Sequence, residues 1–348
     1  MTLWVDKYRP HDLASLSYHK EQAATLSSLV QRDDFPHLLV YGPSGAGKKT
    51  RVRCILRELY GEGVDIVRLH SMPFTTPSGK KLEVHTQESN YHIELTPSDV
   101  GIYDRVIVQD IIKQMAQTSQ IDTTTQKTFK VVVLMEMDEL SRDAQHALRR
   151  TMEKYSSNCR LILCGESLSR VIDPLRSRCM PIRVAAPSDQ EIEFAISEVS
   201  KKEKFVLPPS VVKKITGMAK GNMRRALLTL EALNPAINPI KPNEEIPSIE
   251  WEKYLQETAV MIVRKQGAET LLNARNRLYE IISRCIPPHT IFIHLVRALL
   301  PQCPSSIRGE VLEAAAEYEH RLTKGQKTIF HLEAFVAAFM HIFATAKK

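Results

Sequence analysis

The chain has 348 residues, which is long for one compact domain and suits two or three. Hydrophobic residues make up 43% and charged residues 25%, as in soluble globular proteins, and we expect neither a secretory signal sequence nor an apolar run of membrane-spanning length. The formal net charge of +7 favours an anionic partner, with nucleic acid as the first choice.

The six cysteines form no C-x-x-C pair and no cluster with histidine. This pattern excludes a disulfide framework and a zinc site of the finger type, and it predicts reduced thiols in an intracellular protein.

The N-terminal stretch WVDKYRP combines aromatic, basic and proline residues. It is either a loop that folds over a nucleotide base or an arm that packs on the core, and the residue types alone leave both open. The following segment, His19 to Val30, is predicted to be a helix with Ala23 and Leu26 on its apolar face.

Residues 38–50, LLVYGPSGAGKKT, carry the strongest motif in the chain. A short apolar strand leads into Gly42, Gly47 and Lys48, which have the P-loop spacing G-x-x-x-x-G-K, and an amphipathic helix follows. Glycines let successive backbone N–H groups turn toward a phosphate, the helix N-terminus adds positive charge, and the lysine reaches the outer phosphates. This context predicts nucleotide binding rather than a plain glycine-rich turn.

Two departures affect the metal that usually accompanies this motif. The residue after the P-loop lysine is Lys49 instead of a Ser or Thr that would bind Mg²⁺, and Thr50 comes one position too late. In the later stretch LMEMDEL, Glu136 and Asp138 fit the second and last acids of a D-E-x-D pattern, but the first acid is Met135. We therefore expect nucleotide to bind with Lys48 and Lys49 sharing its charge, with weak or no Mg²⁺ binding and little or no hydrolysis. The alternative is an empty relic of a site.

Alternating strands and helices continue after the P-loop. Ile66–Leu69 is a predicted strand, and residues 73–101 are predicted to be irregular, with KKLEVHT and NYHIELT forming an inserted hairpin. A helix at Val106–Met115, a buried strand at Val131–Met135 and a helix capped by Ser141 follow. The pattern predicts a doubly wound α/β core with the P-loop on its first strand.

From Ser188 onward the chain becomes helical. Ser188 and Glu191 form a capping box, and Asn222 caps a later helix, MRRALLTLEAL. A proline-rich stretch then predicts a linker, and about five helices follow, the last of them buried. The predicted domains are an α/β domain at 1–184, a helical lid at 185–234, a linker at 235–248 and an all-α domain at 249–348.

Six motifs occur together in one order: WVDKYRP, YGPSGAGKKT, LMEMDEL, DAQHALRRTMEKY, RSRC and GNMRRALL. This set, spanning residues 1–235, resembles the small subunits of the eukaryotic clamp loader, replication factor C, and the helical tail resembles their collar. The resemblance implies an AAA+ P-loop module with a helical lid and an oligomerising collar. It also implies one of five subunits in a nuclear complex that uses ATP to load the sliding clamp PCNA onto primer–template DNA in replication and repair, with no membrane partner.

The resemblance also assigns roles to residues. Tyr8, Arg9 and Pro10 would line the adenine pocket, and Arg224 would be the lid arginine that senses nucleotide. Glu136 would be an acid of the degenerate D-E-x-D motif that follows a strand. Arg178, with Ser177 beside it, would be an arginine finger inserted into a neighbouring subunit's ATP site. The phosphates would lie against Gly42, Pro43, Ser44, Gly45, Ala46, Gly47, Lys48, Lys49 and Thr50.

Three further predictions concern charged residues outside the P-loop. Arg105 and Lys113 are candidates for contacts with the DNA backbone, whereas Arg149 and Arg150 fit a subunit interface or a solvated helix face. Glu166 stands where the family usually has a polar amide facing the γ-phosphate. A carboxylate there repels a triphosphate, which weakens the case for ATP over ADP, unless it pairs with Lys49.

The sequence favours this interpretation over two other function classes. A free-standing, catalytically active AAA+ ATPase is disfavoured by Lys49, Met135 and Glu166. A small-molecule kinase is disfavoured by the RSRC motif and the all-helical tail. The sequence leaves open whether the site holds ATP, ADP or no nucleotide.

Overall fold

The computed structural model describes residues 2–32, 34–75, 81–117, 129–156, 158–236, 246–247, 249–325 and 327–346. The chain divides into two compact units, Met1–Ile246 and Pro247–Lys348. Most of the predicted linker 235–248 lies outside the described residues.

The first unit is built on a sheet in the order β2-β3-β4-β5-β6-β1-β7. Its strands β4, β5, β6, β1 and β7 run parallel, whereas β2 and β3 are antiparallel to their neighbours. The P-loop strand β1 therefore lies between two parallel partners, and its carboxyl end opens at the edge where ligands bind in such sheets. The strands are β1 (Leu38–Tyr41), β2 (Arg68–Thr75), β3 (Lys81–Glu88), β4 (His92–Leu95), β5 (Lys130–Leu134), β6 (Cys159–Gly165) and β7 (Met180–Arg183).

The region between the P-loop helix and β4 differs from the sequence prediction. The strand predicted at Ile66–Leu69 begins later and continues through Pro73 as β2, which pairs with β3. Proline is tolerated there because β2 is the edge strand of the sheet. The predicted hairpin is present, because β3 and β4 pair in antiparallel fashion. It is not an insertion, however, since β4 also pairs with β5 and belongs to the main sheet.

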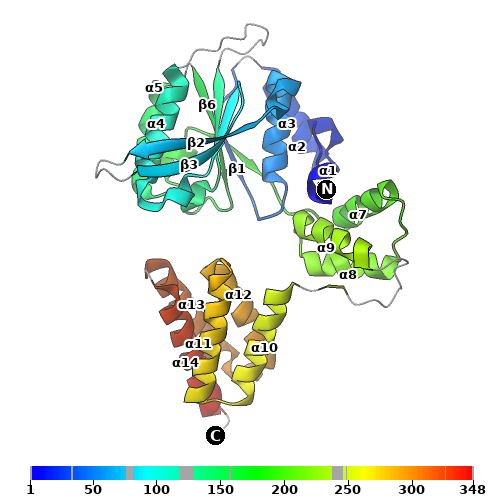
Figure 1. The fold of residues 1–348 in the computed structure, drawn as a ribbon, viewed down its shortest axis with the longest axis vertical. Coiled ribbons are helices and arrows are strands. Elements are labelled where there is room, and N and C mark those ends of the chain that lie inside the picture. The colour runs from blue at the N-terminus through cyan, green and yellow to red at the C-terminus, as the bar shows by residue number, and fades with distance from the viewer. Residues whose placement is uncertain are drawn as a thin grey trace. The chain divides into compact units, whose positions relative to one another are not determined.

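Helices cover both faces of this sheet (Figure 1). Helices α2 (Lys20–Val30) and α3 (Lys48–Tyr60) pack on the face that contains Val131 and Val133. Helices α4 (Asp104–Gln117) and α5 (Arg142–Lys154) pack on the face that contains Val132 and Leu134. Buried residues alternate between the two faces along β5, as expected of a central strand.

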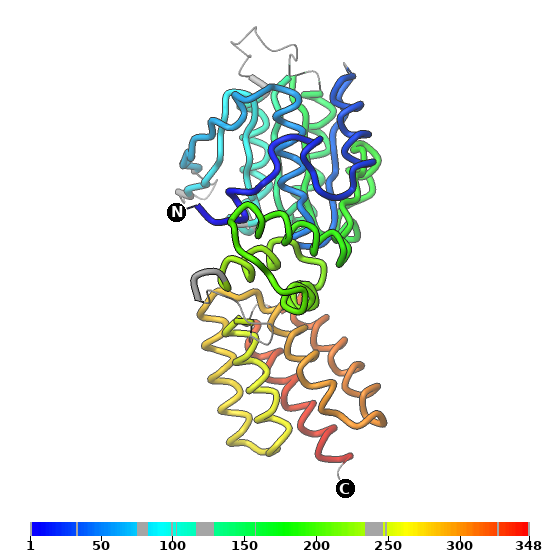
Figure 2. Tube along the Cα trace, turned by 90° about the vertical axis from the view of Figure 1, so that its right-hand side faces the viewer, coloured from blue at the N-terminus to red at the C-terminus, as the bar shows by residue number. Residues whose placement is uncertain are grey.

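Helices α7 (Asp189–Lys202), α8 (Pro209–Ala219) and α9 (Met223–Ala236) form the predicted lid. The capping box of Ser188 and Glu191 is present, and Asn222 Oδ1 accepts a hydrogen bond from the N–H of Arg225. The N-terminal helix α1 (Trp4–Lys7) runs beside the lid helices (Figure 2) and shares their core. Of the two alternatives predicted for WVDKYRP, the structure shows an arm that packs on a hydrophobic core.

The described residues of the second unit form five α-helices, and each packs part of its apolar surface into one core. The last, α14, has the length and composition of a membrane span, contrary to the expectation that no such run exists. Seven of its side chains are nevertheless buried in the core of this unit, as the sequence predicted for this helix. The helices are α10 (Glu250–Arg264), α11 (Ala268–Ser283), α12 (Pro288–Leu299), α13 (Arg308–Lys324) and α14 (Thr328–Ala346).

His37, directly before β1, gives the fold a specific acid sensitivity. Its Nδ1 accepts a hydrogen bond from the N–H of Leu161 at 3.0 Å. Burial and the neighbouring charge of Arg160 lower the pKa of His37 to about 4 from an ordinary value of 6.5. The folded protein therefore keeps this imidazole neutral at pH values where the unfolded chain protonates it.

We predict that the free energy of unfolding falls as the pH drops from 6.5 toward 4, and that His37 contributes up to about 3 kcal/mol of this loss. The sign follows because the unfolded chain binds the additional proton in this range. The variant His37→Asn keeps an acceptor and removes the titration, so its urea-unfolding curves should show a flatter pH dependence. Equal slopes for the two proteins would contradict this assignment.

Candidate nucleotide-binding site

The glycines of the P-loop are required by the conformation of the loop and by its close neighbours. Gly42, Gly45 and Gly47 all have positive φ angles, of 154°, 72° and 86°. A Cβ atom on Gly42 would lie 1.9 Å from the carbonyl oxygen of Val184, and one on Gly47 would lie 2.3 Å from the hydroxyl of Tyr18. The predicted P-loop is therefore present, and its backbone packs too closely for side chains at these positions.

Two buried residues that the sequence analysis missed support the loop from behind. The hydroxyl of Tyr18 donates a hydrogen bond to the carbonyl oxygen of Ala46 at 2.7 Å. Arg51, only 1% exposed, donates to the carbonyl oxygen of Tyr18 at 3.1 Å and stacks over its ring at 4.7 Å. A charged residue on the apolar face of the P-loop helix was the available signal for this contact.

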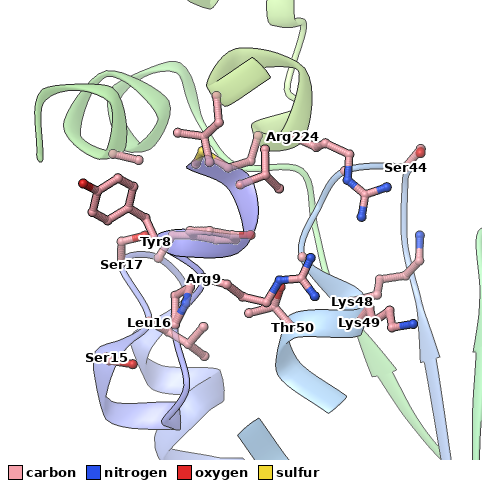
Figure 3. A pocket seen from close by; sticks show the side chains of 18 of the residues that line it. Tyr8, Arg9, Ser15, Leu16, Ser17, Ser44, Lys48, Lys49, Thr50 and Arg224 are labelled. Atoms are coloured by element: carbon pink, nitrogen blue, oxygen red, sulfur yellow. The ribbon is translucent and has the colours of Figure 1, made fainter. Parts of the chain in front are cut away.

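A cavity of about 760 Å³ opens in front of the loop, within the size range of small-molecule sites. Side chains enter it from the N-terminal arm, from the P-loop and from the lid (Figure 3). The predicted site residues that line it are Tyr8, Arg9, Pro10, Ser44, Gly45, Gly47, Lys48, Lys49, Thr50, Glu136 and Arg224, together with Met135, Asp138 and Glu166.

Lys48 begins α3 and lies over the loop. Its ammonium donates hydrogen bonds to the carbonyl oxygens of Gly42, at 2.6 Å, and Pro43, at 3.0 Å. Burial lowers the pKa of Lys48, whereas the negative charges of Glu166 and Asp138 oppose that shift. These two carboxylates are therefore near enough to Lys48 to offset part of its positive charge.

Lys49 has a different partner from the one that the sequence suggested. Its ammonium forms an ion pair with Glu94 of β4 at 2.7 Å, whereas the sequence analysis had named Glu166 as a possible partner. The expectation that Lys49 shares the phosphate charge with Lys48 does not match this geometry, because its charge is already neutralised by a buried carboxylate.

The acids after β5 are also engaged elsewhere. Glu136 has a left-handed backbone with φ of 53°, and its Oε2 accepts a hydrogen bond from the hydroxyl of Ser98 at 2.8 Å. Asp138 Oδ1 accepts one from the N–H of Glu166 at 3.2 Å. With Met135 and Lys49 in the ligand positions of the motif, these residues do not fit a P-loop Mg²⁺ site, and no cluster of three or more metal-ligating side chains occurs within the described ranges.

The arm and the lid both contact the site. The hydroxyl of Tyr8 donates to Glu203 at the end of α7 at 2.6 Å, and Lys7 pairs with the same carboxylate. The N–H of Met223, the first residue of α9, donates to the carbonyl oxygen of Gly45 at 3.2 Å. Arg224 follows directly in the first turn of α9, so the lid reaches the P-loop through its backbone and presents this arginine to the cavity.

Arg178 lies apart from the cavity, between α6 (Asp173–Arg176) and β7. Its guanidinium donates to Glu153 of α5, at 2.8 Å from Nε, and to the carbonyl oxygen of Pro174 at 2.8 Å. Ser177 donates to the same carbonyl at 3.1 Å. The structure thus does not bring Arg178 to the nucleotide cavity of its own chain.

The two DNA candidates are exposed on α4, also away from the cavity lining. Arg105 and Lys113 both face solvent. The buried carboxylate of Asp104, at the start of α4, accepts hydrogen bonds from the N–H and the hydroxyl of Ser141, the N-cap of α5. This contact fixes the first turns of α4 and α5 side by side.

Comparisons with known proteins agree with this architecture. The family model of the replication factor C subunit 3 C-terminal domain matches residues 251–347, and that of the RCF1/5-like AAA+ ATPase lid domain matches 195–234. Replication factor C subunit 3 of Bos taurus is 55% identical over 343 residues, which cover 99% of this chain and 96% of the relative. The chain belongs to the replication factor C subunit family. The corresponding Homo sapiens protein is 54% identical over 99% of this chain and 96% of its own length.

Other matches place the chain within that family and within a wider fold. Replication factor C subunit 5 of Schizosaccharomyces pombe is 47% identical, with 98% of this chain and 97% of the relative covered. The animal relatives are named replication factor C subunit 3, whereas the fission yeast relative is named subunit 5. A model described as the DNA polymerase III delta subunit matches residues 18–188. The Thermotoga maritima RuvB branch-migration motor shares the fold, with a TM-score of 0.52 at 14% identity over 78% of this chain and 85% of that one.

The contact between lid and P-loop makes Gly45 sensitive to substitution. In Gly45→Ala the new Cβ would lie 1.9 Å from Oδ1 of Asn222, at a φ of 72° that disfavours L side chains. We predict a loss of about 1–2 kcal/mol in stability and faster hydrogen exchange in the first turn of α9. Gly217→Ala is the control, because its Cβ meets open space on helix α8, and it should be neutral or slightly stabilising. Equal effects of the two substitutions would contradict this account.

Proposed function

We propose that this replication factor C subunit acts in the clamp loader that places PCNA on primer–template DNA at the expense of ATP, as a nucleotide-binding but non-hydrolysing subunit. One combined observation carries the proposal. The sequence is similar to that of replication factor C subunits over nearly the whole chain, and the metal-binding positions of its P-loop cavity hold Lys49 and Met135.

In this proposal a nucleoside di- or triphosphate occupies the cavity. The base would lie against Tyr8, Arg9 and Pro10, and the phosphates against the loop of Gly42 to Thr50, where backbone N–H groups and the start of α3 provide positive potential. Arg9, whose pKa is lowered by burial and by neighbouring Arg53, and Arg224 of the lid add charge at the walls of the cavity.

Hydrolysis at this site is not supported by the residues present. Phosphoryl transfer in P-loop proteins needs a metal ion held by the hydroxyl after the lysine and by a strand carboxylate, and a group that orients the attacking water. Lys49 and Met135 occupy the first two positions, and Glu136 is hydrogen-bonded to Ser98. We infer that nucleotide binding here depends little on Mg²⁺.

Arg178 would act on a neighbouring subunit. An arginine finger supplied in trans contributes roughly 10³–10⁵ in rate where phosphoryl transfer depends on it. The position of Arg178 outside its own cavity, on a short connection after α6, supports such a role. Its ion pair with Glu153 would orient the guanidinium before it meets the neighbour's nucleotide.

DNA contacts are proposed on the exposed surface of α4. Helix N-termini and basic side chains bind backbone phosphates without reading sequence. Arg105 and Lys113 are exposed on α4 and would contribute to such contacts, with an affinity that falls as salt rises.

The remaining assignments follow from membership of the clamp-loader family. We propose an α/β domain at 1–184, a lid at 185–234, a linker at 235–248 and a collar at 249–348 that joins the other subunits of a heteropentamer. We also propose a nuclear location and no membrane partner.

The finger role predicts how two variants should differ in the reconstituted five-subunit complex. Arg178→Ala in this chain should lower ATP hydrolysis stimulated by clamp and primed DNA about tenfold or more, because a neighbouring site loses its cation. Lys48→Ala should change turnover little, because the chain's own site does not hydrolyse ATP. Steady-state release of phosphate measures both.

The controls separate the finger from assembly defects. Arg176→Ala, on an exposed neighbouring arginine paired with Asp173, should leave turnover unchanged, and size-exclusion chromatography should show intact pentamers for all variants. If Lys48→Ala abolished the activity while Arg178→Ala had none of the expected effect, the subunit would itself be a hydrolysing ATPase.

A further inference from the structure

Glu94 is a buried carboxylate beside the nucleotide cavity that the roles above leave unused. Its side chain is 5% exposed, and it lies on β4, a strand that the sequence analysis had placed in an insertion. Buried carboxylates are uncommon unless they are paired, so the partners of Glu94 indicate what it does.

The sheet register directs Glu94 toward the P-loop helix. In the parallel pair β4–β5, Glu94 is opposite Val133, and residues in register on adjacent strands share a face. Val133 belongs to the core beneath α3. Glu94 therefore faces α3, where Lys49 and Arg53 lie one turn apart on the same side of the helix.

Both basic residues contact this carboxylate. Lys49 Nζ lies 2.7 Å from Oε2 of Glu94, and Arg53 Nε lies 3.6 Å from Oε1. Burial favours the neutral acid, but the ammonium of Lys49 and the charge of Arg53 outweigh it, so the pKa of Glu94 lies below its ordinary value. Glu94 therefore stays a carboxylate near neutral pH, and Lys49 is the closer of its two basic partners.

The position of Lys49 gives this pair a consequence for ligands. Residue 49 is the P-loop position whose side chain normally faces the metal and the outer phosphates, and Lys49 lines the cavity. Its side chain is 30% exposed, so its stem borders the cavity while its charge is committed to Glu94. The ammonium of Lys48, in contrast, donates hydrogen bonds to carbonyl oxygens of the loop, and these are its only hydrogen bonds found in the described part of the chain. A phosphate can replace these carbonyl oxygens as its partner.

We propose that Glu94 determines the charge of the nucleotide site by withholding the ammonium of Lys49 from the phosphates. This inference rests on nucleotide binding as proposed above and specifies which of the two adjacent lysines serves it. With Lys49 neutralised and with Asp138 and Glu166 acting on Lys48, the site presents less positive charge to an outer phosphate than its two lysines suggest.

The inference differs from a purely structural role for the pair. If Glu94 only anchors α3 to the sheet, then its loss lowers stability and leaves nucleotide affinity unchanged or weaker. If it withholds Lys49, then its neutralisation frees an ammonium that can turn into the cavity, and affinity rises, most for the ligand with the additional phosphate charge. A gain of affinity upon removal of a buried carboxylate is a result that an anchor does not produce.

The test is titration calorimetry of ADP and ATP with the purified full-length chain in EDTA. Glu94→Gln should bind ATP about five-fold more tightly than the unmodified chain, the size expected for one partly exposed ion pair, and should gain less for ADP. Lys49→Met should bind within about two-fold of the unmodified chain, because its ammonium does not contact the phosphates. The double variant Lys49→Met/Glu94→Gln should lose the gain, and Glu83→Gln, on an exposed carboxylate of β3, is the matched control.

The outcomes separate this inference from the proposed function. Binding by the unmodified chain with no gain in Glu94→Gln, or a tenfold loss in Lys49→Met, overturns the role of Glu94 and leaves nucleotide binding in place. Absence of binding in every protein overturns both. Binding that appears only in Glu94→Gln supports the inference and overturns nucleotide binding by the native subunit. If Glu94→Gln does not fold, as judged by circular dichroism, Lys49→Met decides whether the ammonium of Lys49 contacts the phosphates: an affinity within about two-fold of the unmodified chain supports the inference, and a tenfold loss overturns it.

Discussion

Gly42, Gly45 and Gly47 of the P-loop have no room for a Cβ atom against other parts of the first unit, and the site depends on this close packing. Gly42 meets the backbone at Val184 after β7, Gly47 meets Tyr18, and Gly45 meets Asn222 before α9. A ligand that reshapes the loop must therefore displace the strand end, the arm or the lid. This gives a physical route by which a bound nucleotide can influence the lid even where no hydrolysis takes place.

The charges around the loop form a second constraint. Lys49 is paired with Glu94, Asp138 with the backbone of Glu166, and Glu136 with Ser98. Each contact occupies a group that an active P-loop site would direct at the metal or the attacking water. We infer that a site of this kind binds nucleotide through its backbone and Lys48 without hydrolysing it. We propose that such a subunit contributes to catalysis through Arg178, which lies outside the cavity in another part of the α/β core.

Sequence reasoning succeeded where local stereochemistry determines structure. The glycine spacing of the P-loop, the N-cap of Ser141, the capping box of Ser188 and the buried face of α14 follow from neighbouring residues, and all are present. Between Ile66 and Leu95 it predicted the hairpin of β3 and β4 but missed the full length of β2 and the pairing of β4 with β5. Pro73 argues against a strand unless the strand is known to lie at an edge. The missed strand pairing hid Glu94, whose pairing with Lys49 depends on the register of β4 against β5. The partners of Arg178 and Tyr18 were inaccessible for the same reason, since tertiary packing decides them.

We propose that residues of the chain, in place of a metal ion, neutralise the phosphate charge of a nucleotide bound in this site. The most direct measurement is the affinity of the purified full-length chain for ADP with excess Mg²⁺ and again with EDTA. We predict dissociation constants that agree within about two-fold. A loss of tenfold or more upon removal of Mg²⁺ would contradict the claim and would mean that a metal ion binds in this site despite Lys49 and Met135.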